Sequence, residues 1–157
     1  MLTIPVDGTA AIPYLQTPFN EHSGRISPDG SWMAYVSDES GTEEIYVQSF
    51  PNPGRKRRVS TGGGLSPVWG PTARTLFYLA PSGEVMEAEL SPSAGGIEVR
   101  PARALFKVPP PVGTGWHDRN QFAVTADGQR FLISLPVEDP SPRDITVILN
   151  WKPGAKP

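Results

Sequence analysis

A strand–turn–strand unit that recurs along the chain is the feature that most limits how this sequence can fold. Its copies overlay on one another without gaps at residues 26–36, 69–79 and 124–134. Asp29-Gly30 and Asp127-Gly128 supply turn chemistry in the first and third copies, because Asp can accept backbone N–H groups and Gly tolerates positive φ. The middle copy has Thr72-Ala73 there, a degenerate version of the turn. Such self-similarity predicts stacked, equivalent units of structure.

Further apolar stretches extend the first two copies to four short strands and the third copy to three. Four antiparallel strands every 40 to 50 residues are typical of a β-propeller blade. The opening of the chain fits the outer half of such a blade, and no fourth strand follows the last copy. One domain over residues 1–157 is therefore predicted, with its units at residues 1–17 (outer strands), 24–61 (blade), 65–108 (blade) and 119–151 (inner strands).

Composition supports short strands and excludes a helical architecture. The chain has 16 glycines and 19 prolines in 157 residues, so a helix breaker falls every four or five positions. An all-β fold is expected.

The residues around the first turn resemble a known repeat. Ser27-Pro28-Asp29-Gly30, with residues 32–37 and 45–47, resembles the WD40-like PD40 repeat of TolB-type six-bladed propellers. Residues 18–21, 46–51, 59–64 and 147–151 are similar to the propeller at the C-terminal end of many bacterial Ser/Thr protein kinases. The resemblance implies a protein- or ligand-binding propeller, with relatives in the periplasm or on the outer side of receptor-like kinases. The middle turn lacks Asp-Gly, and only about half of six blades are present.

Half a propeller would leave two apolar blade faces uncovered. We therefore expect a β-propeller fragment of about three four-stranded antiparallel blades that a second copy completes to six. In this homodimer, the N-terminal strands of one chain share a blade with the C-terminal strands of the other. The alternatives are a different association or domain swap, and a fragment separated from its other half. A stable monomer is the least favoured.

The sequence carries few signs of catalysis or of a cofactor. Cysteine is absent, and the two histidines have no metal-binding spacing. Gly62-Gly63-Gly64 lacks the features of a phosphate loop and is expected to connect two blades. The acidic residues at 38–39 and 43–44 suggest a solvated hairpin tip more than a calcium site, and the basic residues 55–58 suggest a solvated sheet edge. We expect no cofactor and no metal.

The net charge and the hydropathy of the chain limit the classes of partner that it is expected to bind. A net charge of −2 disfavours nucleic acid, and no apolar run is long enough to insert into a membrane. No signal peptide is recognisable, so the compartment stays open.

The predicted function is non-catalytic binding or scaffolding, with a protein partner or a small ligand at the channel mouth, in the sensor part of a larger protein. The alternatives are a hydrolase or other enzyme whose site forms only in the closed oligomer, and an orphan fragment without its own function. Binding residues are expected in the loops before the innermost strands, where aromatic and Arg side chains offer contact area. The candidates are His22, Arg25, Trp69, Trp116, His117, Asp118 and Arg119.

Overall fold

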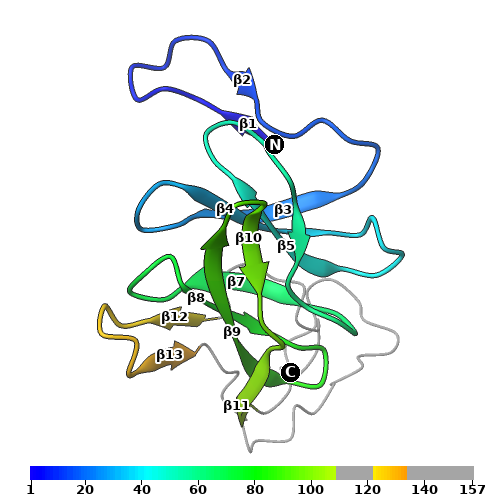
Figure 1. Cartoon of the computed structure of the whole chain (residues 1–157), viewed down its shortest axis with the longest axis vertical. Helices are drawn as coiled ribbons and strands as arrows, with labels where there is room; N and C mark the ends of the chain where they lie inside the picture. Colours follow the sequence, from blue (N-terminus) through cyan, green and yellow to red (C-terminus); the bar gives the residue numbers. More distant parts are fainter. Residues whose placement is uncertain (109–121, 134–157) are drawn as a thin grey trace, which may run out of the picture.

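The computed structural model describes residues 1–108 and 122–133, and this part of the chain is all-β. It forms small antiparallel sheets that do not close into a barrel (Figure 1). The expectation of an all-β fold is confirmed. Among the described residues, no helix is long and apolar enough to cross a membrane.

The first sheet contains four strands in chain order, over nearly the stretch predicted at residues 24–61. They are β3 (Glu21–Ile26), β4 (Trp32–Ser37), β5 (Glu44–Ser49) and β6 (Arg57–Arg58). A bulge between His22 and Arg25 lets β3 continue back to Glu21, so this strand starts earlier than expected. The edge strand β6 has only two residues, and both arginines are exposed, which discourages pairing with another edge.

The second sheet has five strands, so the expectation of four is wrong here. They are β7 (Leu65–Trp69), β8 (Thr75–Leu79), β9 (Glu84–Ser93), β10 (Gly96–Val99) and β11 (Arg103–Lys107). β9 is long enough to pair with β11 along its first half and with β10 along its second half. The extra strand forms because Gly96 adopts φ +117° in the hairpin turn, which places Ile97 in the core, fully buried.

Two hairpins complete the described part of the chain. The N-terminal hairpin consists of β1 (Leu2–Thr3) and β2 (Ile12–Pro13), both shorter than the strands expected at residues 2–6 and 13–17. The C-terminal hairpin consists of β12 (Phe122–Val124) and β13 (Phe131–Ile133). The strand expected at residues 144–151 lies outside the described residues.

The repeated turns have the same hydrogen bonds, so their sequence equivalence is also structural. The carboxylate of Asp29 accepts from the N–H two positions later at 3.0 Å, and that of Asp127 does the same, also at 3.0 Å. Gly30 and Gly128 both have φ +72°. In the degenerate middle turn, the hydroxyl of Thr72 accepts the matching N–H at 3.3 Å.

The sheets stack in chain order, with a buried cluster between each neighbouring pair (Figure 1). This arrangement follows from strand alternation, because successive side chains point to opposite faces. The first and second sheets share a cluster that includes Ala34, Val36, Ile45, Val47, Leu76, Tyr78, Ala88 and Leu90. The second sheet and the C-terminal hairpin share Phe77, Leu79, Val85, Phe122 and Phe131. The N-terminal hairpin and its flank meet the first sheet through Tyr14, Met33, Tyr35 and Tyr46.

Candidate functional site

The stack has two distinct edges that carry polar groups. The turns at residues 27–31, 70–74 and 125–130 lie along one side of the molecule, at the left in Figure 1, and are called the turn edge below. The loop at residues 38–43 lies on the opposite side, where β3 begins with Glu21 and His22. This side is called the His22 edge.

His22 makes two hydrogen bonds at the His22 edge. Its Nδ1 lies 3.0 Å from the Ser23 hydroxyl, and its Nε2 lies 3.0 Å from the Glu43 carboxylate. The His22 side chain is 37% exposed. The three side chains therefore form a connected chain of hydroxyl, imidazole and carboxylate.

The backbone of Ser23 is strained, with φ +55°, and strain of this kind is a reason to suspect function. The second sheet, however, has the same feature at Ser66, where φ is +51° in the matching bulge of β7. Leu65 stands there in the place of His22. The strain therefore belongs to the architecture of the innermost strands, and the His22–Glu43 contact ties the start of β3 to the loop before β5.

The expectation of a solvated hairpin tip is wrong for Glu44, which is buried at the start of β5 and has a structural role. Its carboxylate is buried, at 3% exposed, and accepts from the N–H groups of Gly62 and Gly63 at 2.9 and 3.1 Å. It also accepts the hydroxyl of Ser60. Gly62 and Gly63 both have positive φ, so this segment connects the sheets as expected, held in place by a buried charge.

The neighbouring carboxylates face different partners and do not converge. Asp38 accepts the N–H of Asn20 at 2.9 Å, Glu39 pairs with Lys56, and Glu43 contacts His22. Across residues 1–108 and 122–133, no group of three or more His, Asp or Glu side chains could hold a metal ion.

Trp69 and Arg25 meet at the junction of the first and second sheets. The Trp69 ring is 9% exposed and belongs to the buried cluster, while its Nε1–H donates to the Arg25 carbonyl at 2.9 Å. The expectation that these residues and His22 lie in loops before the innermost strands is wrong. All three lie inside β3 or β7, and the bulge in β3 lets that strand begin early enough to include His22. Trp69 therefore packs sheet against sheet. The other candidates, Trp116, His117, Asp118 and Arg119, lie outside the described residues.

A pocket on the turn edge was not foreseen from the sequence. It has a volume of about 430 Å³, and its walls include Pro28, Asp29, Trp32, Pro71, Arg74 and Pro92. Pro28 and Pro71 occupy matching positions in the first and second copies of the repeat. This match is the sequence feature that could have indicated the pocket. The pocket itself depends on Pro92 of β9, whose position beside the two turns only the fold reveals.

Neither the known protein-family models nor the curated proteins include a match to this chain. Its function therefore has to be inferred from its own geometry.

Proposed function

We propose that this chain supplies half of a six-bladed β-propeller that a second copy completes, and that the closed ring is a non-catalytic binding or scaffolding module. The second copy is the partner in this proposal. A protein or a small ligand would then bind at the channel mouth. The sequence resemblance to PD40 repeats supports the six-bladed count, and the sheet stack supports the blade-like packing.

The observation that carries the proposal is a matching pair of uncovered apolar positions at the two ends of the stack. Ile26 of β3 is 50% exposed on the end of the first sheet that the short N-terminal hairpin covers only in part. Leu132 of β13 is 76% exposed on the C-terminal hairpin. Apolar side chains at such positions favour burial against another surface.

The junction between the first and second sheets provides a template for covering these positions. By the repeat, Trp69 corresponds to Ile26, and Ala34 corresponds to Leu132. Trp69 and Ala34 share one buried cluster within the chain. A second copy would place its Leu132 over Ile26 in the same way, with its C-terminal hairpin beside the N-terminal hairpin of the first copy. Two such junctions related by a twofold axis close the ring.

The non-catalytic part of the proposal is supported by how the polar groups of the His22 edge are used. The carboxylates of Glu43 and Glu44 are both bonded to groups of the chain itself. These contacts anchor loops, and a rigid loop framework suits recognition.

A cross-linking experiment tests the closed dimer. The chain has no cysteine, so every disulfide in the double variant Ile26→Cys/Leu132→Cys joins these two positions, and the single variants Ile26→Cys and Leu132→Cys measure cross-linking between like positions. The two positions lie at opposite ends of the stack within one chain, so a disulfide between them has to join two chains. We expect oxidation to give a covalent dimer on a non-reducing gel. The control pair is Val6→Cys/Leu132→Cys, since Val6 is fully exposed at the tip of the N-terminal hairpin. Cross-linking no greater than in the control would contradict the proposal.

The enzyme alternative has its own test. We expect a panel of ester and peptide substrates to show no turnover by the purified chain. Hydrolysis that is present and is lost in His22→Ala, with the fold intact by circular dichroism, would overturn the non-catalytic assignment.

A further inference from the structure

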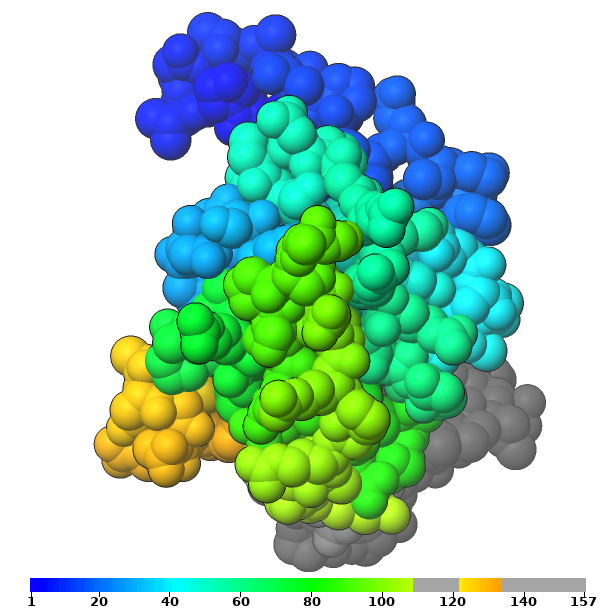
Figure 2. All heavy atoms as spheres, in the orientation of Figure 1, coloured from blue at the N-terminus to red at the C-terminus, as the bar shows by residue number. Residues whose placement is uncertain are grey.

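The pocket on the turn edge lies where the first and second sheets meet. Its walls come from the β3–β4 turn, the first residue of β4, the β7–β8 turn and β9. Figure 2 shows the two turns along the left side of the molecule, in blue and green. The apolar part of the wall consists of the half-buried Trp32 and three rigid rings, Pro28, Pro71 and Pro92. The volume of about 430 Å³ lies within the range of small-molecule sites, and the pocket is open to solvent, since the three prolines and both charged residues of its wall are exposed.

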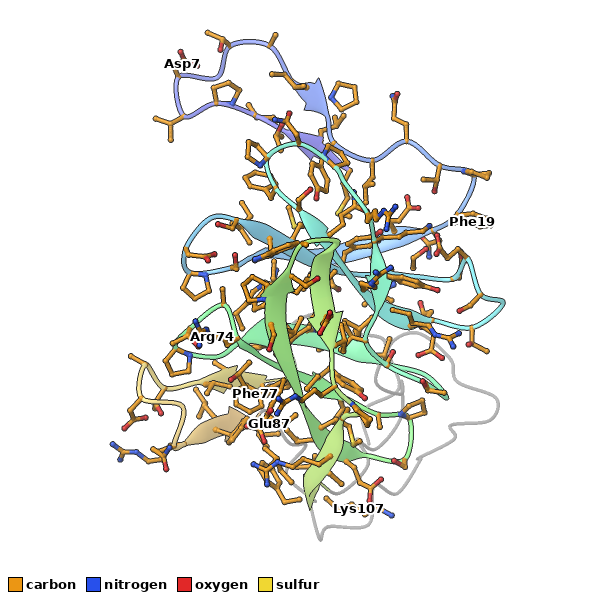
Figure 3. The ribbon with its side chains drawn as sticks, in the orientation of Figure 1. Asp7, Phe19, Arg74, Phe77, Glu87 and Lys107 are labelled. Carbon is orange, nitrogen blue, oxygen red and sulfur yellow. The ribbon has the colours of Figure 1, made fainter. Side chains whose placement is uncertain are left out.

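Two opposite charges face this pocket without pairing with each other. Arg74 lies on the β7–β8 turn (Figure 3), and Asp29 lies on the β3–β4 turn. Among the described residues, no salt bridge joins them, and the Arg74 guanidinium makes no hydrogen bond or ion pair. One carboxylate oxygen of Asp29 accepts from the Ser27 hydroxyl and the Ser31 N–H, and the Ser31 hydroxyl also lies close to this carboxylate.

The combination of these groups selects a ligand class. Asp29 would repel a purely anionic ligand, and Arg74 would repel a purely cationic ligand. A dipolar ligand satisfies both, and an apolar body would occupy the space between Trp32 and the prolines. We infer that this pocket binds a zwitterionic, amino-acid-like ligand with an apolar side chain, its ammonium on Asp29 and its carboxylate on Arg74.

This inference is independent of the proposed ring closure. Every wall of the pocket comes from one chain, so binding requires no second copy. The failure of the cross-linking test would leave the pocket in place, and the failure of binding would leave the ring in place.

Three matched probes test the inference. L-Phenylalanine carries both charges, N-acetyl-L-phenylalanine lacks the ammonium, and L-phenylalaninamide lacks the carboxylate. Titrations followed by ¹⁵N–¹H NMR would report on the Trp32 indole and on the backbone of both turns. We expect L-phenylalanine to bind about tenfold more tightly than either analogue, because each lost charge removes a charge-assisted hydrogen bond.

Charge-neutral variants assign each contact. Asp29→Asn keeps an acceptor for the turn, and we expect it to abolish the preference for L-phenylalanine over the N-acetyl compound. Arg74→Gln should abolish the preference over the amide. The matched controls are Asp127→Asn and Arg130→Gln on the equivalent β12–β13 turn, which does not line the pocket, and they should leave all three affinities unchanged.

The inference would be overturned by equal affinity for the three probes, or by resonance shifts confined to residues away from the pocket. Equal effects of the pocket variants and the control variants would also overturn it.

Discussion

Glu44 is a buried polar residue whose substitution should destabilise the fold. Its buried carboxylate accepts two backbone N–H groups of the linker and one hydroxyl. Glu44→Ala leaves the buried N–H of Gly63 and the hydroxyl of the buried Ser60 without that partner. We expect it to lower the free energy of unfolding by about 3 kcal/mol, measured by urea denaturation.

The control for this prediction is Glu89→Gln. Glu89 makes an exposed surface pair with Arg100, so the change should stay within about 0.5 kcal/mol. Equal effects of the two substitutions would mean that the carboxylate does not hold the linker.

Asp29 should make stability depend on pH in the acid range. The hydroxyl of Ser27, and then the N–H of Ser31, hold the pKa of Asp29 below its usual value of 3.8. A pKa that is lower in the folded state gives stability that is present above the unfolded value and is lost as the pH falls through the folded value. The Tm difference between the wild type and Asp29→Asn should therefore be constant above about pH 5 and shrink below about pH 4. A difference that does not change with pH would show that the charge of Asp29 contributes nothing.

At the residue scale, the sequence predicted the turn chemistry but not the role of Trp69. Asp-Gly between two apolar strands is a local signal, and both such turns formed as expected. Whether a Trp faces a ligand or a neighbouring sheet depends on which face of the strand it occupies. The bulge in β7 changes that face, and bulges have no sequence signature here.

At the scale of elements, β10 is the strand that the sequence did not predict. Residues 92–96 contain Pro92 and two glycines, which are typical of a linker. The glycines instead form a hairpin turn, and Ile97 contributes to the core between the first and second sheets. Local composition could not distinguish a linker from a hairpin. The free energy that stabilises the hairpin comes from packing against a sheet that is distant in the sequence.

Ile97→Ala tests how much this hairpin contributes to the fold. Ile97 is fully buried, so the substitution removes buried methyl groups and leaves a cavity. We expect the free energy of unfolding to fall by about 3 kcal/mol, measured with urea. Glu98→Ala changes the exposed neighbour on the same strand and should have an effect below about 0.5 kcal/mol. A small effect at Ile97 would mean that β10 does not pack in solution.

For the whole molecule, the stacked sheets follow from the nearly continuous burial along β4, β5 and β8. These strands are buried on both faces, which requires a neighbour on each side. The repeat predicted this layered arrangement. It could not predict what covers the two ends, because that depends on surfaces outside one chain.

The most direct test of the account is the mass of the wild-type protein in solution, measured by light scattering on a size-exclusion column. We predict a single species of twice the chain mass of 17.0 kDa. Leu132→Asp, which puts a charge on the exposed face of the C-terminal hairpin, should convert it to the monomer. A homogeneous wild-type monomer would contradict ring closure by a second copy.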